Sequence, residues 1–221
     1  MNLSNLNFSR TLKIGVFSLM AFLSTNISYS QDFGADLVSS YVWRGTQFGS
    51  GAHIQPYMDL GSGNLTGGVW GSFPTSANGG GNELDAYVSY DFGPLALTVT
   101  NYTFPDGDGT YSSGGFFEGD LEISASTDIG GLSLMAGYFP DLETLYVEAG
   151  FGLGAVDFAI GFGSDSADAF YVGAGESAIC NVSLGYSKEI KITDDYSLPL
   201  FSSFIFNPKS EAAFIVFGAS F

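Results

Sequence analysis

The chain has few basic residues, a single cysteine and no long apolar run, and each shortage excludes a class of protein. Its 221 residues include six Lys and Arg against 23 Asp and Glu, a formal net charge of −17. Nucleic-acid binding is excluded, because phosphate contacts need a basic face. Cys180 alone can form no internal disulfide, which excludes a disulfide scaffold. No stretch reaches the roughly 18 apolar residues of a membrane-spanning helix.

The N-terminus carries an export signal. Arg10 and Lys13 precede a short apolar segment, residues 14–23, and small residues stand at Ser28 and Ser30. This order is typical of a secretory signal peptide. We therefore assign residues 1–30 to a signal peptide cleaved near Ser30, and residues 31–221 to a single domain. That domain keeps four basic residues against 23 acidic ones, a net charge of −19.

Alternation of apolar and polar residues is what the chain has in abundance. From residue 35 onward the apolar period is 2, which predicts strands. We expect about twelve, each near the roughly 9 to 11 residues that a tilted membrane strand needs. The expected strands are 35–44, 52–60, 64–73, 83–92, 94–104, 116–127, 131–139, 143–152, 155–163, 178–189, 196–206 and 211–221.

The two faces of these strands differ in chemistry, and the connections alternate between short and long. In 116–127, for example, Leu121 and Ile123 oppose Asp120 and Glu122. A soluble barrel buries its apolar face, whereas a membrane barrel turns it to lipid. The export signal and the alternating C-terminus that ends on Phe221 favour the membrane reading. The fold class we predict is all-β: a transmembrane antiparallel barrel with long extracellular loops and short periplasmic turns.

Aromatic residues fall at both ends of the expected strands, as at the two interfaces of a bilayer. One set is Tyr41, Trp43, Phe73, Tyr138 and Phe162, and the other is Phe92, Phe151 and Phe221. This distribution predicts two aromatic girdles in contact with outer-membrane lipid. Phe217 and Phe221 would form the C-terminal signal read by the outer-membrane assembly machinery.

The segment 36–45, DLVSSYVWRG, resembles the opening strand of the TorF-type (Gcw_chp) porin family. Similar patterns follow in order at 67–72 (GGVWGS), 82–87 (NELDAY) and 102–105 (YTFP), with a later Glu118. The resemblance implies a porin-type barrel in the bacterial outer membrane. It carries over no catalytic or ligand-binding residue.

Strand parity predicts that Arg44 points into an acidic lumen while Tyr41 and Trp43 face lipid. We expect Arg44 to pair with Glu83, Asp85, Glu118 or Asp120, because its planar fork suits carboxylates. The alternative is an interfacial Arg that extends beside the aromatic girdle. The lumen and constriction candidates are Arg44, Asp59, Glu83, Asp85, Asp91, Glu118, Asp120, Glu122, Glu148 and Asp157.

A ring of carboxylates concentrates cations, so the sequence predicts a passive channel for cations or small polar solutes. Bulky residues of inward parity leave open a barrel filled by its own side chains: Tyr57, Trp70, Tyr87, Tyr102 and Tyr146. The competing hypothesis is a non-conducting surface barrel whose loops, chiefly 105–115 and 164–177, bind a partner or polysaccharide.

No cofactor, metal or enzymatic activity is expected. The one histidine, His53, has no evident nucleophile beside it and reads as a rim or lumenal residue. The segment 105–110, PDGDGT, is a poor match to a calcium loop. Cys180 shares parity with Val182 and Leu184, which predicts a lipid-facing position.

Overall fold

The computed structural model describes residues 30–77, 79–106, 115–164, 171–172 and 176–221, and most of them form one closed barrel. The predicted signal peptide therefore lies outside the described residues, apart from Ser30. Twelve antiparallel strands close the barrel, which confirms the predicted all-β antiparallel barrel and its strand number. They are β1 (Ser30–Val38), β4 (His53–Ser62), β5 (Leu65–Pro74), β6 (Glu83–Asp91), β7 (Ala96–Thr103), β8 (Asp120–Ile129), β9 (Leu132–Phe139), β10 (Thr144–Leu153), β11 (Val156–Gly163), β12 (Ala178–Lys191), β13 (Ser197–Asn207) and β14 (Ala212–Ser220).

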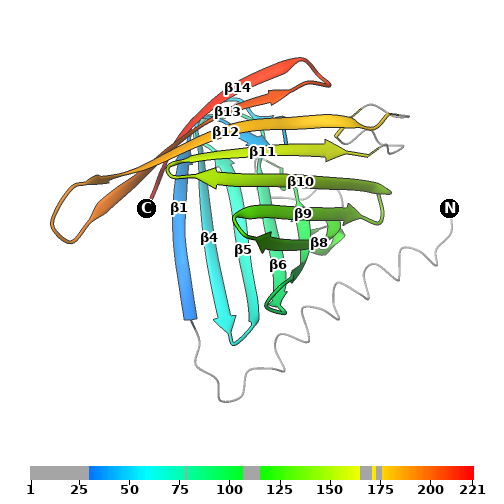
Figure 1. Cartoon of the computed structure of the whole chain (residues 1–221), viewed down its shortest axis with the longest axis horizontal. Coiled ribbons are helices and arrows are strands. Elements are labelled where there is room, and N and C mark those ends of the chain that lie inside the picture. The colour runs from blue at the N-terminus through cyan, green and yellow to red at the C-terminus, as the bar shows by residue number, and fades with distance from the viewer. Residues whose placement is uncertain (1–29, 78, 107–114, 165–170, 173–175) are drawn as a thin grey trace.

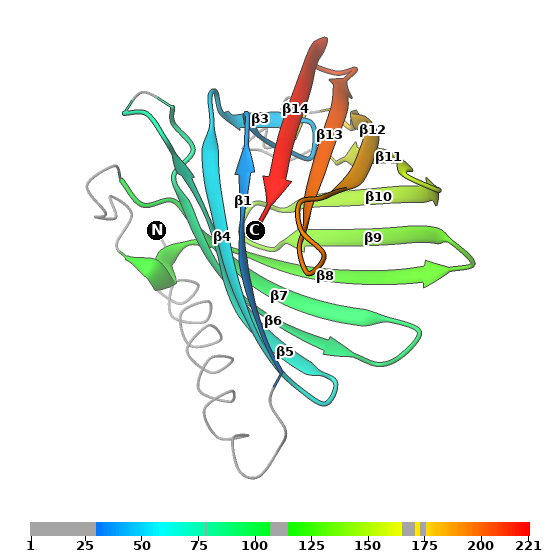
Figure 2. The same cartoon turned by 90° about the vertical axis from the view of Figure 1, so that its left-hand side faces the viewer.

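Each barrel strand pairs with its neighbours in chain order, and β1 closes the ring by pairing with both β4 and β14. The closing seam is short: β14 pairs with β1 between Asp36 and Val38, and backbone bonds of Ala35 with Phe221 and of Ser39 with Phe217 flank this stretch. The strands on opposite walls cross at a steep angle, and the β12–β13 hairpin extends well beyond the rest of the barrel (Figure 1, Figure 2).

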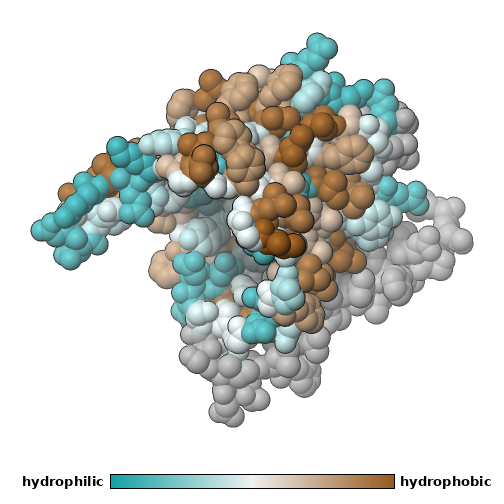
Figure 3. Space-filling view, viewed as in Figure 1, coloured by the Kyte–Doolittle hydropathy of each residue, from teal (hydrophilic) through white to brown (hydrophobic). Residues whose placement is uncertain are grey.

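The outer surface of the barrel is apolar. Register places Leu134, Phe158, Ile160, Leu184 and Ile215 on the outside, and all are exposed. The space-filling view shows apolar side chains over the strands and a hydrophilic β12–β13 turn (Figure 3). A soluble barrel would bury these residues, so the fold has the inverted arrangement of a barrel solvated by lipid. Within the described residues, no helix is long and apolar enough to span a membrane.

The first strand differs from the prediction. It runs over Ser30–Val38 rather than 35–44, and the segment after it folds back as a small hairpin of β2 (Tyr41–Trp43) and β3 (Thr46–Gly49). Tyr41 and Trp43 therefore belong to neither the barrel wall nor an aromatic girdle, and their predicted contact with lipid is wrong. Alternation is continuous along 35–44, but the chain leaves the barrel wall after Val38 and turns into the lumen. The other girdle residues at that end, Phe73, Tyr138 and Phe162, do lie exposed.

The predicted orientation of Cys180 is also wrong. The pairing of β11 with β12 shifts between Gly161 and Phe162, so that Asn181 and Ile179 oppose them and Cys180 is an extra residue. A bulge of this kind changes the direction of the side chains that follow it. Ile179 is consequently exposed, while Cys180 is fully buried inside the barrel. Residue parity counted along the sequence cannot register such an insertion.

Candidate functional site: the lumen and its inner hairpin

The β2–β3 hairpin lies inside the barrel and ends in a two-residue turn, Arg44–Gly45. Trp43 pairs with Thr46 across this turn, and both turn residues have positive φ, 49° for Arg44 and 80° for Gly45. A two-residue hairpin turn whose central residues both have positive φ matches the twist of its strands. Glycine adopts this geometry freely, whereas a left-handed arginine costs about 1 to 2 kcal/mol. A residue stays in such a conformation where its surroundings hold it there, and Arg44 is held by the contacts of its side chain.

The base of the hairpin packs against the wall formed by β4, β5 and β6. The Tyr41 hydroxyl donates a hydrogen bond of 2.7 Å to Glu83, and its ring lies 5.6 Å from that of Trp70. The hydroxyl of Ser40 bonds the carbonyl of Gly49 at 2.8 Å, which ties the two strands of the hairpin together. The buried side chain of Tyr41 therefore holds the hairpin against the barrel wall, in addition to the chain connections to β1 and β4.

Arg44 extends from the tip to the opposite wall and forms a buried ion pair with Glu122 of β8. The two groups lie 2.8 Å apart, and their side chains are 7% and 2% exposed. Arg44 also donates to the Tyr171 hydroxyl. Its guanidinium carbon lies 4.2 Å from the ring centroid of Trp43 and 4.5 Å from that of Tyr146. Cation–π contacts of this kind are strongest where water is excluded.

Arg44 lies in the lumen as predicted, but the inner hairpin carries it there and not the parity of a barrel strand, and its partner differs from the prediction. Glu83 and Asp85 face a different part of the lumen, and Glu122 forms the ion pair in their place. The sequence could not identify Glu122, because the level that Arg44 reaches depends on a hairpin that leaves the wall. Tyr171, which lies in the connection between β11 and β12, was likewise missed because no strand pattern marks it.

The tip of the hairpin fits against the far wall with no free space. A methyl group on Gly45 would collide with the backbone carbonyl of Cys180. The side-chain amide of Asn207 donates a 3.1 Å hydrogen bond to the Gly45 carbonyl. On β9, a Cβ at Gly137 would occupy the position of the Glu122 carboxylate. Both positions therefore require glycine: Gly45 at the tip of the hairpin and Gly137 beside the ion pair.

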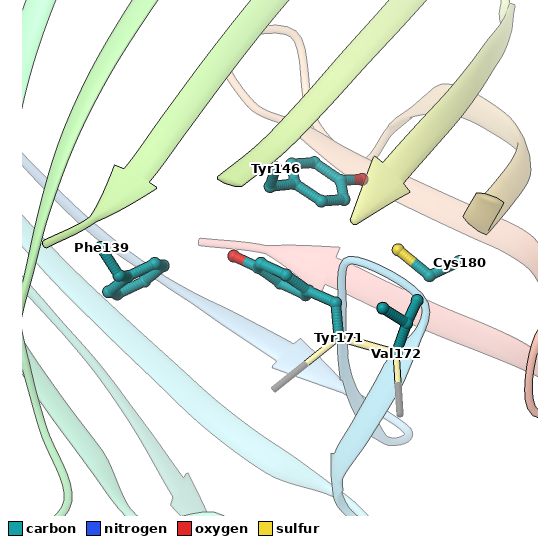
Figure 4. Close-up of a cluster of buried hydrophobic side chains, with 5 residues drawn as sticks. All are labelled: Phe139, Tyr146, Tyr171, Val172 and Cys180. Atoms are coloured by element: carbon teal, nitrogen blue, oxygen red, sulfur yellow. The ribbon is translucent and has the colours of Figure 1, made fainter. Parts of the chain in front are cut away.

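An aromatic cluster fills the end of the barrel above Arg44. Phe139, Tyr146, Tyr171, Val172 and Cys180 are all buried and pack together. Figure 4 shows Tyr171 and Val172 entering beside the hairpin, with Tyr146 and Cys180 contributed by the wall. Together with the hairpin, this cluster narrows the lumen at the end where the long connections lie.

Most of the predicted acidic candidates point into the lumen and are engaged there. Glu83 and Asp85 lie on the inner face of β6 and are nearly fully buried. Asp59 accepts a hydrogen bond from Tyr87. Glu148 accepts one from Tyr146 and another, of 2.9 Å, from Asn181. Tyrosine hydroxyls thus bond four of the acidic candidates: Asp59, Glu83, Glu122 and Glu148.

The remaining candidates lie at the ends of the lumen or outside it. Asp120 faces inward opposite Tyr102. Asp157 is exposed near the short turns, and Asp91 is exposed at the same end, where it accepts a 2.6 Å hydrogen bond from the Gly93 amide. Glu118 does not line the lumen, because it belongs to an exposed 3-10 turn, η1 (Phe116–Glu118), that precedes β8. Strand β8 begins at Asp120, four residues later than alternation predicted, so Glu118 precedes it.

Two cavities lie in the lumen between the described residues. The hairpin cavity, of about 490 Å³, lies between the hairpin and the walls of β1, β4 to β7, β13 and β14. The turn-end cavity, of about 480 Å³, is lined by acidic and small residues of β8 to β12, including Asp128 and Asp157. Ser203 borders both cavities, so they meet along β13. The lumen is therefore partly filled and partly hollow.

His53, the one histidine of the chain, is completely buried in the barrel wall, where its Nδ1 lies 3.0 Å from the hydroxyl of Ser72, which is also buried. Among the described residues, no group of three or more His, Cys, Asp or Glu is arranged to hold a metal ion. The predicted calcium-like segment 105–110 falls mostly outside the described residues.

No protein-family model matches the chain, and no curated protein matches its sequence. The resemblance of 36–45 to TorF-type porins therefore stays a prediction. Structurally this segment is divided between β1 and the inner hairpin. Phe217 and Phe221 lie on the outer face of the last strand, 61% and 65% exposed, where the proposed assembly signal would be accessible.

Proposed function

We propose that the protein is a bacterial outer-membrane channel for the passive passage of cations or small polar solutes. The observation that carries the proposal is an apolar outer surface around a lumen into which acidic side chains point. Lipid-solvated barrels need such an outer surface, because no other solvent accepts so many exposed apolar residues. The predicted export signal and the exposed C-terminal aromatic residues agree with this location.

The sign of the lumenal charge supports preference for cations. Asp36, Asp59, Asp120 and Glu148 face inward from four walls, whereas Arg44 is the only Lys or Arg that does so among the described residues. Lys188 points outward, and Lys191 and Lys209 pair with carboxylates at the two ends of the barrel. An excess of carboxylates along a narrow path concentrates cations and repels anions.

The inner hairpin would act as the constriction. It crosses the lumen, and Arg44 fixes its tip to Glu122. A solute must pass beside this ion pair and the aromatic rings around it. Selection would therefore depend on width and on the local charge, without any covalent chemistry.

Reconstitution of the refolded protein in a planar bilayer tests the proposal. Under a salt gradient, we expect stable conductance steps whose reversal potential has the sign of cation preference. Protein that is folded, as judged by heat-modifiable migration on a gel, but silent at every voltage would contradict it. The filled loop end of the lumen would then favour the competing hypothesis, a non-conducting surface barrel that binds a partner through its loops.

A further inference from the structure

The hairpin cavity has the composition of a binding site as well as of a passage. It is bordered by six aromatic residues and three carboxylates, and no Lys or Arg lines it. Its volume of about 490 Å³ lies within the range of roughly 300 to 1,000 Å³ in which proteins hold small ligands. The aromatic and acidic residues come from the hairpin and from the wall, so the site exists only while the hairpin is inside.

The carboxylates of this cavity have no basic partner within the part of the chain that the structure describes; Glu83 accepts a hydrogen bond from the Tyr41 hydroxyl and Asp85 one from the Thr103 amide. Glu83 and Asp85 lie two residues apart on the inner face of β6 and are only 2% and 4% exposed. Asp36 approaches from β1 on another side. Arg44, the nearest candidate in the lumen, is already paired with Glu122. Buried carboxylates without a counter-charge are costly, and a cation within the cavity would offset that cost.

The aromatic rings determine which kind of cation fits. Tyr41 and Trp70 are inclined at 58° to each other, and Trp43 and Tyr102 at 52° with centroids 5.4 Å apart. Ring faces attract an alkylammonium group, whose charge is spread over an apolar surface. A hydrated inorganic ion would find few hydrogen-bond partners on these rings. A neutral ligand of the same shape would leave the carboxylates uncompensated.

The neighbouring part of the lumen already holds a cation by this chemistry. The Arg44 guanidinium lies over the faces of Trp43 and Tyr146 and pairs with Glu122. Trp43 borders both this arrangement and the hairpin cavity. We propose that the hairpin cavity binds an organic ammonium ion, a protonated or quaternary amine, on its way through the barrel. Passage of the ammonium ion through the barrel rests on the proposed channel function. Its binding in the hairpin cavity does not.

The two tryptophans of the chain, Trp43 and Trp70, both line this cavity, so their fluorescence reports its occupancy directly. Choline is the probe for the refolded full-length barrel in detergent micelles. Its neutral isostere, 3,3-dimethylbutan-1-ol, and sodium chloride at equal ionic strength are the matched controls. We expect a saturable change in tryptophan emission with choline alone. An equal response to the neutral isostere, or none to choline, would overturn the proposal.

Variants distinguish binding in the hairpin cavity from a general attraction of cations by the acidic lumen. Neutralising Glu83→Gln and Asp85→Asn together should weaken choline binding about tenfold or more. Gln and Asn each keep a side-chain oxygen that can accept the hydrogen bonds from the Tyr41 hydroxyl and the Thr103 amide, so the anchor of the hairpin is retained. Asp36→Asn provides a second test from another wall. Asp157→Asn, which lines only the turn-end cavity, should leave binding unchanged. An equal loss with Asp157→Asn, or no loss with the other variants, would contradict the site.

The same preparation distinguishes this proposal from the channel itself. Choline binding without conductance would support the site and contradict the channel. Conductance without choline binding would leave the channel standing and refute the site. If both are correct, choline added to one side of a bilayer should reduce the sodium current in a concentration range that matches its binding curve.

Discussion

Replacing Arg44 by Ala removes the lumen's one inward-facing basic side chain among the described residues and, with it, the basic partner of Glu122. Ala keeps the same positive φ, so the change isolates the side chain from the strain of the turn. Glu122 is 2% exposed, and a buried carboxylate that loses its partner destabilises a protein by about 3 to 5 kcal/mol. The hairpin can lessen this cost by leaving the lumen and admitting water to Glu122.

Two measurements record these responses. Urea unfolding in lipid vesicles, followed by gel mobility, should show a lower free energy of unfolding for Arg44→Ala. Planar-bilayer recordings should show larger conductance and a reversal potential shifted further toward cation preference, because one positive charge has left an acidic path. Adding Glu122→Gln should recover stability, with a coupling energy of about 1 to 3 kcal/mol between the two positions.

Lys209→Ala is the matched control. It breaks an exposed ion pair with Glu176 at the loop end, and exposed pairs contribute at most about 1 kcal/mol. Its conductance and unfolding should be close to those of the unmodified protein. If Arg44→Ala changes neither stability nor conductance, the hairpin is not held by this ion pair and the reasoning fails.

Gly45→Ala should displace the hairpin tip, because a methyl group would collide with the Cys180 carbonyl, and conductance should rise; Gly63→Ala has a similar positive φ but open space around it, so it should not change the current. Asn207→Ala removes the hydrogen bond to the Gly45 carbonyl together with those that its Oδ1 accepts from the Lys209 and Ser210 amides, and should destabilise the protein by at least about 1 kcal/mol, measured by the same unfolding assay; an unchanged midpoint would show that these bonds are not needed. Native Cys180 should resist a membrane-permeant maleimide until the barrel is unfolded, whereas cysteine introduced at Ile179 in a Cys180→Ala background should react, and rapid labelling of native Cys180 would refute the bulge. Brominated lipids should quench an introduced Leu134→Trp far more than Trp43 or Trp70, and equal quenching would place the hairpin outside the barrel.

The sequence by itself determined the barrel. Alternation at period 2 is a local property of each strand, and Leu121 and Glu122, for example, fall on opposite faces in any antiparallel pairing. The number of strands follows from the number of alternating segments. Hence eleven of the expected segments lie within a few residues of the observed strands, although 116–127 began too early and wrongly included Glu118.

The inward direction of most acidic candidates followed for the same reason. Glu83, Asp85 and Glu148 needed only the parity of their own strands. Parity fails where the chain departs from regular pairing. The bulge at Cys180 inserts one residue, and the hairpin after Val38 leaves the wall altogether. The wrong orientations predicted for Cys180 and for Tyr41 and Trp43 both arise from these irregularities of strand pairing.

Only the tertiary structure decided what lies inside. The ion pair between Arg44 and Glu122 joins residues 78 positions apart, and the bond from Asn207 to Gly45 joins residues 162 apart. No local pattern encodes such contacts, because they depend on how far a hairpin reaches across a closed ring. The sequence therefore determined a barrel with an acidic interior. The closure of the barrel in three dimensions determined that this interior contains a hairpin, an ion pair and a cavity.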